Sequence, residues 1–267
     1  MRIVFATDGS RGALAAVDFL AALPLSCADE LYIVTSPTGS ESEAYAVLAE
    51  CRWRFVQRAV PTMTIIRTGA AAEVVEAVAI ERAAELIVVG SRGLGAVRGA
   101  LLGSVARDLA RNTSVPVLVV RARREAPRHM LVAVDGSTEG HAAIDLVARL
   151  PLPSAARMTL VHILAAPNDD RSSVSVVEHA HAAVGDRITD QVVVDRGHIG
   201  DEVLRQAIVS ASDLIVLGAR GHTQPAGLLN ASVADHVLEH AHCAVLVAKA
   251  PLQPRTIEIR PRVAMAI

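Results

Sequence analysis

The chain has 267 residues, of which 52% are hydrophobic and 20% charged, and its formal net charge is −2. This length accommodates two domains of ordinary size. The nearly balanced charge argues against nucleic acid or an anionic membrane as a partner. Aromatic residues make up only 2%, so the cores must be aliphatic, as in parallel sheets that helices cover on both faces.

The first 120 residues alternate between strand-like and helix-like segments. In chain order we expect a strand at 3–7, a helix at 13–23, a strand at 31–35, a helix at 41–58, a strand at 62–67, a helix at 71–84, a strand at 86–89, a helix at 104–111 and a strand at 117–120. This alternation predicts an α/β fold with an open, mostly parallel, doubly wound five-stranded sheet and right-handed crossovers.

The same pattern then repeats. ATDGS at 6–10 returns as AVDGS at 133–137, an offset of 127 residues, and LIVVGSRG at 86–93 returns as LIVLGARG at 214–221, an offset of 128. A third block, 117–120, returns as 245–248. Three blocks that repeat in the same order predict a tandem duplication of a whole domain.

The repeat sets the expected domain boundaries. We assign residues 1–124 to the first domain and 128–250 to the second, with a charged, proline-containing linker at 121–128. Residues 251–267 have no counterpart in the first copy and form a C-terminal tail, in which 256–260 could add an edge strand or stay disordered.

The cysteines and the N-terminus bear on location. Cys27, Cys51 and Cys243 are far apart, odd in number and form no C-x-x-C pair, which predicts reduced thiols. The N-terminus runs straight into a strand without a signal-peptide core. No apolar stretch approaches the roughly 18 to 20 residues that span a bilayer. We therefore expect a soluble, cytoplasmic protein.

The loop after the fourth strand, at 90–104, is rich in glycine and reads GSRGLGAVRGALLGS. Glycine lets a backbone turn tightly and bring its N–H groups to a phosphate. Ser104 then opens a helix, whose N-terminus attracts anions. The Ser104 hydroxyl can cap that helix or bind phosphate. Arg92 and Arg98 could add positive charge near the phosphates. The alternative is a flexible glycine loop without a ligand, but the position between strand and helix favours a phosphate site.

Two other nucleotide motifs do not fit this loop. The chain has no G-x-x-x-x-G-K-[ST], so the loop is not a P-loop. Arg98 stands where the third glycine of a Rossmann fingerprint belongs, and the loop follows the fourth strand rather than the first. We therefore expect neither of these sites.

The spacing of Gly90, Gly93, Gly103 and Ser104 resembles the motif of the ATP-binding members of the universal stress protein family, which reads G, two residues, G, nine residues, G and S or T. Asp8, at the end of the first strand, matches that family's aspartate on the nucleoside side. The resemblance covers both copies. It implies an internal pseudo-dimer through the last strands, 117–120 and 245–247, whose exposed edges tend to be paired. It leaves a homodimer of the whole chain open.

The resemblance also implies ATP as the cofactor, with Mg²⁺ arriving with the triphosphate because the sequence shows no dedicated metal cage. The implied site in the first copy has three parts. Adenine and ribose are flanked by Ala6, Thr7, Asp8 and Ser36. The ribose and phosphate path is lined by Val89, Gly90, Ser91 and Gly93. The phosphates are held by Gly103, Ser104, Val105 and Ala106.

The second copy departs from the motif. It keeps the counterparts Asp135, Gly218, Gly221 and Ser232. However, Ala231 replaces the glycine before the serine, Ala226 stands at the position of Arg98, and Pro225 removes one N–H donor. We therefore expect the second site to be weaker, altered or inactive.

All ten histidines lie between His129 and His242. His236 and His240 are spaced i, i+4 on the last helix, a spacing that can bind a metal. No third ligand is placed convincingly, although Asp235, Glu239 and Cys243 are near in sequence. We therefore expect a solvated helix face and no metal site. His198 and the following glycine are interpreted as a loop with a helix cap.

The sequence thus predicts an adenine-nucleotide-binding regulator or sensor of a stress response that acts on an unknown protein partner. Two alternatives stay open. One is a slow ATPase or adenylate-handling enzyme in which Asp8 orients Mg²⁺ or water. The other is a scaffold that binds no nucleotide. Because the sequence has no recognisable nucleophile or base, we expect at most weak ATP hydrolysis.

Overall fold

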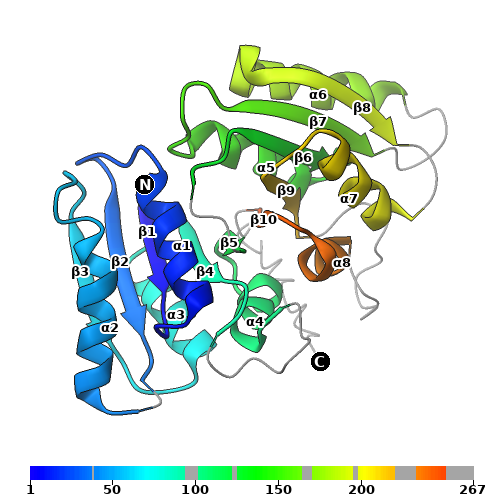
Figure 1. Ribbon diagram of the computed structural model, residues 1–267. Helices are drawn as coiled ribbons and strands as arrows, with labels where there is room; N and C mark the ends of the chain where they lie inside the picture. The colour runs from blue at the N-terminus through cyan, green and yellow to red at the C-terminus, as the bar shows by residue number, and fades with distance from the viewer. Residues whose placement is uncertain are drawn as a thin grey trace, which may run out of the picture.

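The chain folds around one ten-stranded sheet with the strand order β3-β2-β1-β4-β5-β10-β9-β6-β7-β8 (Figure 1). This computed structural model describes residues 1–37, 39–93, 102–121, 125–163, 170–194, 198–219 and 233–250. Among these residues, no helix is long and apolar enough to cross a membrane.

The elements of the first half are β1 (Arg2–Ala6), α1 (Arg11–Ala22), β2 (Glu30–Thr35), α2 (Glu41–Trp53), β3 (Thr62–Ile66), α3 (Ala71–Glu81), β4 (Leu86–Gly90), α4 (Ser104–Asn112) and β5 (Val117–Val120). The predicted α/β alternation is confirmed. Two helices end three or more residues earlier than expected. α3 ends because Ala83 adopts a left-handed conformation with φ 47°. α2 ends at Trp53, where the backbone N–H of Arg54 bonds back to the carbonyls of Cys51 and Arg52.

The second half repeats this order. Its elements are β6 (His129–Val134), α5 (Thr138–Arg149), β7 (Arg157–Ile163), α6 (Asp170–Val184), a short 3₁₀ helix η1 (Gly185–Arg187), β8 (Ile188–Val194), α7 (Ile199–Val209), β9 (Leu214–Gly218), α8 (Val233–His240) and β10 (Ala244–Ala248). Within each half, all paired strands run parallel.

Two aliphatic cores lie on opposite faces of the sheet. In β1, Ile3 and Phe5 pack into one core and Val4 and Ala6 into the other, because successive side chains of a strand point to opposite faces. Helices α1, α2, α5 and α6 cover the first core, and α3, α4, α7 and α8 the second. Each core contains residues of both halves. The unbroken aliphatic runs in the sequence are therefore strands that are buried on both faces.

The two halves join through β5 and β10, which pair as expected, and the pairing is antiparallel. Leu118 pairs with Leu246, its own counterpart in the repeat, and Val117 and Val119 pair with Val247 and Val245. A residue that meets its own counterpart lies on a twofold axis. The halves are therefore related by a pseudo-twofold axis at this pair.

A reciprocal pair of cations reinforces the junction. Arg121, directly after β5, donates to the carbonyls of Leu238 and Glu239 in the last turn of α8. Lys249, directly after β10, donates to the carbonyl of Ala110 in α4 at 2.6 Å. Positive charge is favourable at a helix C-terminus. Each half thus places a cation against the final helix of the other.

We predict that Arg121→Met lowers the free energy of unfolding by about 1 to 3 kcal/mol, because charge-assisted hydrogen bonds to partly buried helix carbonyls are lost. Urea denaturation followed by circular dichroism measures this. Arg67→Met is the control, since it removes an exposed ion pair with Glu81 and should shift the midpoint much less. Equal shifts in the two variants would contradict the role assigned to Arg121.

Candidate functional site

A cavity of about 780 Å³ lies at the carboxyl ends of β1, β2 and β4. The strand order places β2 on one side of β1 and β4 on the other, so the cavity is at the point where the connections change direction. Ligands of open α/β sheets bind at such switch points. The cavity is therefore the candidate site of the first half.

Eleven of the residues that the sequence assigned to the first-half site line this cavity: Ala6, Thr7, Asp8, Ser36, Val89, Gly90, Gly93, Gly103, Ser104, Val105 and Ala106. Ser91 is buried beside it and is not among the lining residues. Its backbone N–H donates to Val120 at 2.8 Å, and its carbonyl accepts the N–H of Gly103 at 2.7 Å. Ser91 thus ties the end of β4 to β5 and to the start of α4.

Asp8 is held at the start of α1. Its Oδ1 accepts the backbone N–H of Ser10 at 3.0 Å. The Ser10 hydroxyl accepts the N–H of Ala13 as the helix N-cap and donates to the carbonyl of Arg92 at 3.1 Å. A Cβ on Gly93 would collide with the Asp8 carboxylate. Glycine at position 93 therefore lets the loop pass directly over the aspartate.

The hydroxyls of Thr7 and Ser36 also have partners. Thr7 Oγ1 accepts the N–H of Gly9 at 3.3 Å and lies 3.6 Å from the Sγ of Cys51. Burial raises the pKa of the Cys51 thiol, so that thiol stays protonated and acts as a hydrogen-bonding neighbour rather than a nucleophile. Ser36 Oγ donates to the carbonyl of Gly69 at 2.7 Å and so ties β2 to the loop before α3.

The N-terminus of α4 forms one end of the cavity. Gly103 is the N-cap and offers no side-chain cap, and the first turn contains no acidic residue. Ser104 stands at the first helical position, so its hydroxyl does not cap the helix. The N–H groups of Ser104, Val105 and Ala106 have no partner within their own helix, as in the first turn of any α-helix. Among the described residues no partner takes them up, so they can face an anion in the cavity.

Part of the cavity wall was not predicted from the sequence. The starts of α2 and α3 contribute Ser40, Glu43, Ala44, Val47, Ala71 and Val75. Ser40 and Glu43 form a capping box. The Ser40 hydroxyl accepts the backbone N–H of Glu43 at 3.2 Å, and the Glu43 carboxylate accepts the backbone N–H of Ser40 at 3.1 Å. The sequence predicted both helix starts, and the S-x-x-E pattern at 40–43 agrees with the first, but it did not indicate that they line the cavity.

The cavity is lined by both apolar and polar groups. Val34, Val47 and Val75 give an apolar wall, whereas Asp8 and the first turn of α4 supply polar groups. Among the described lining residues the carboxylates are Asp8 and Glu43, and each accepts a backbone N–H. The described wall therefore suits a ligand with a flat apolar part and an anionic part, and it lacks an obvious catalytic base.

In the second half, only part of the corresponding site is described. Asp135 Oδ1 accepts the N–H of Ser137 at 3.0 Å, which repeats the arrangement of Asp8. Gly218 ends β9 as Gly90 ends β4. Gly221 and Ser232 lie outside the described residues, as do Arg98 and the substituted positions 225, 226 and 231. The altered second site therefore stays a prediction.

The acidic neighbours of His236 on α8 are turned toward the first half. Asp235 pairs with Arg111 of α4 at 2.8 Å, and Glu239 pairs with Arg107 at 3.0 Å. They are therefore occupied at the junction between α4 and α8, and His236 finds other partners.

Comparison with known proteins places both halves in one family. The model of the Universal stress protein family matches residues 1–121 and 127–249. Universal stress protein Rv2005c of Mycobacterium tuberculosis is 30% identical over 191 residues, which cover 64% of this chain and 64% of that protein. The match thus spans less than two thirds of that relative. Universal stress protein Rv2623 of the same species is 30% identical over 203 residues, covering 68% of this chain and 67% of that protein.

A solved structure shows the same fold over almost the full length. A universal stress protein from Archaeoglobus fulgidus has a TM-score of 0.73 and 18% identity, with 94% of this chain and 98% of that chain covered. At this identity the likeness concerns the fold alone.

We predict that the motif glycines differ in their importance for folding. A Cβ on Gly90 would lie 2.5 to 2.7 Å from the backbone of Gly12 and Ala13, whereas a Cβ on Gly103 would meet no described residue closer than 3.4 Å. Gly90→Ala should therefore cost about 1 to 3 kcal/mol of stability through overpacking, and Gly103→Ala no more than about 0.5 kcal/mol. Thermal and urea unfolding measure both. A Gly103→Ala protein as unstable as Gly90→Ala would contradict this distinction.

Proposed function

This chain belongs to the universal stress protein family, and from that premise we propose that it binds an adenine nucleotide in the cavity of its first half. The observation that carries the proposal is the convergence of three features on one cavity of about 780 Å³: an apolar wall, an aspartate and an uncapped helix N-terminus. This volume lies within the range of roughly 300 to 1,000 Å³ for small-molecule sites.

Each part of a nucleotide has a suitable neighbour in the cavity. The base packs against the apolar wall of Val34, Val47 and Val75. The ribose hydroxyls donate to Asp8, a carboxylate that is already fixed by a backbone hydrogen bond. The phosphates accept N–H groups from the first turn of α4, where the helix dipole favours negative charge. Arg92, also on the lining, adds positive charge, and Mg²⁺ accompanies the triphosphate.

The position of α4 suggests a regulatory rather than a catalytic role. The first turn of α4 would contact the phosphates, while Arg107 and Arg111 on the same helix are paired with α8 of the second half. Nucleotide occupancy would therefore change a surface that contains both halves and that a protein partner could read. The two carboxylates of the described wall are both held by backbone N–H groups, which favours binding over rapid turnover.

We predict that the purified full-length protein binds ATP in the presence of Mg²⁺ with one tight site, measurable by isothermal titration calorimetry. Asp8→Ala should weaken that site roughly 10- to 100-fold, since a hydrogen bond to a charged group is lost. The matched control is Asp135→Ala, which removes the counterpart in the second half and should leave the tight site intact. No binding at millimolar ATP, or equal weakening by the two variants, would contradict the proposal.

Gly103→Ala tests the phosphate end separately. The added methyl would lie 3.7 Å from the backbone nitrogen of Gly93, between two of the groups assigned to phosphate. We predict that the wild-type protein binds ATP more tightly than AMP. Gly103→Ala should reduce this difference in affinity without lowering the thermal stability of the protein. If the ratio of the ATP and AMP dissociation constants were the same in the variant as in the wild type, the phosphates would not lie at this position.

A further inference from the structure

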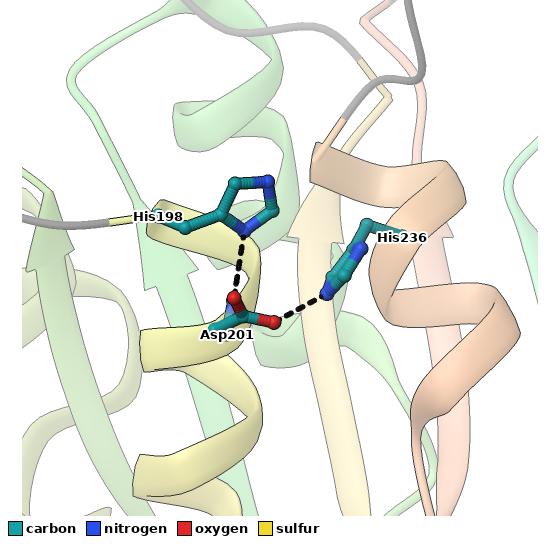
Figure 2. A group of neighbouring side chains, drawn as sticks. All are labelled: His198, Asp201 and His236. Carbon is teal, nitrogen blue, oxygen red and sulfur yellow. Dashed lines mark hydrogen bonds and ion pairs between the residues drawn. The ribbon is translucent and has the colours of Figure 1, made fainter.

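Three side chains of the second half converge between α7 and α8, away from the cavity of the first half (Figure 2). His198 is the N-cap of α7, Asp201 lies in its first turn, and His236 projects from α8. One carboxylate oxygen of Asp201 lies 3.3 Å from His198 Nδ1 and the other 2.7 Å from His236 Nε2. The two histidines thus share the carboxylate of Asp201, which lies 35 positions before His236 in the sequence.

The surrounding residues hold His236 in this place. A Cβ on Gly200 would lie 2.6 Å from Cδ2 of the His236 ring, so the ring packs directly on the backbone of α7. On its other side His236 stacks on His240, with 4.4 Å between ring centroids. His240 Nδ1 in turn hydrogen-bonds to the carbonyl of His236 at 2.9 Å. The imidazole is therefore positioned by packing from two helices.

The donor atoms are of types that bind metal ions, and they lie close together. Two imidazole nitrogens and a carboxylate oxygen lie within 4.8 Å of one another. Two ligands that each lie 2.0 to 2.1 Å from a tetrahedral zinc ion are about 3.3 Å apart, which matches the distance from His198 Nδ1 to Asp201. We propose that His198, Asp201 and His236 bind Zn²⁺ or a similar divalent transition metal ion.

The exposure of the three side chains fits such an ion. The His198 and Asp201 side chains are 62% and 68% exposed and that of His236 24%. The two outer ligands can therefore adjust around the anchored His236, and water can fill the remaining coordination position. The nearby acids do not compete, because Asp235 and Glu239 pair with arginines of α4. The sequence analysis weighed only the neighbours of His236 along α8, because the side chains of His198 and Asp201 come near it only in the folded chain.

A second histidine–aspartate pair provides a matched control. His179 Nε2 lies 2.8 Å from Asp145 Oδ1, and the ring of His141 is adjacent at 5.1 Å between centroids. This pair has the same atoms and nearly the same distance as His236 and Asp201. It is not part of a group with three ligand atoms in reach among the described residues. A variant of this pair therefore distinguishes the loss of a metal ligand from the loss of an ordinary histidine–aspartate hydrogen bond.

The test is titration of untagged, chelator-treated full-length protein with Zn²⁺ alone, by calorimetry and by competition with a chromogenic chelator. We expect one saturable site in the micromolar range or tighter. His236→Ala and Asp201→Asn should each weaken it about tenfold or more, since loss of even an outer-shell partner costs that much. His179→Ala should bind like the wild type. Circular dichroism checks that each variant is folded.

Two further measurements address geometry. Co²⁺ should give visible absorption bands of a four- or five-coordinate ion in the wild type and lose them in His236→Ala. Gly200→Ala retains all three ligands and favours the helix, yet its methyl should displace His236 and weaken Zn²⁺ binding. Absence of a saturable site, or equal losses in His179→Ala and His236→Ala, would overturn the proposal. The three side chains would then form only a hydrogen-bonded cluster.

Discussion

The antiparallel pairing of β5 with β10 holds the two halves of this molecule together. Without it, each half would end in an unpaired aliphatic edge strand, a strong template for aggregation. Leu118 meets its own counterpart Leu246, so a single pairing satisfies both edges and creates the pseudo-twofold axis. The same pairing brings α4 beside α8, where Arg107 and Arg111 find Glu239 and Asp235. Both candidate sites therefore adjoin helices that this junction positions.

Because of this junction, the second half supports the first-half cavity whether or not it binds a nucleotide itself. The first turn of α4 lines the cavity, while Lys249 of the second half binds a carbonyl in the last turn of the same helix at 2.6 Å. Loss of the phosphate grip in the second loop would leave this support unchanged. A duplicated domain can thus keep a structural role after its own site has altered.

The sequence predicted what depends on short patterns and missed what depends on contacts across space. Aliphatic runs such as Val117–Val120 and the glycine spacing from Gly90 to Gly103 were sufficient for the strands, the repeat and the position of the cavity. The wall from α2 and the meeting of His198 with His236 arise only when helices pack together. The early end of α3 rests on the left-handed φ of Ala83. An alanine in the sequence gives no indication of such a backbone conformation.

The glycine motif itself combines two different constraints. Gly90 must lack a side chain because the start of α1 packs against it, and Gly93 because the Asp8 carboxylate lies beneath it. Gly103 has no such neighbour among the described residues, since a Cβ there meets only ordinary contacts of 3.4 Å or more with them. What a methyl at that position would obstruct is a ligand at the N-terminus of α4. Position 231 lies outside the described residues. By analogy with Gly103, we expect the alanine there to affect phosphate affinity more than folding.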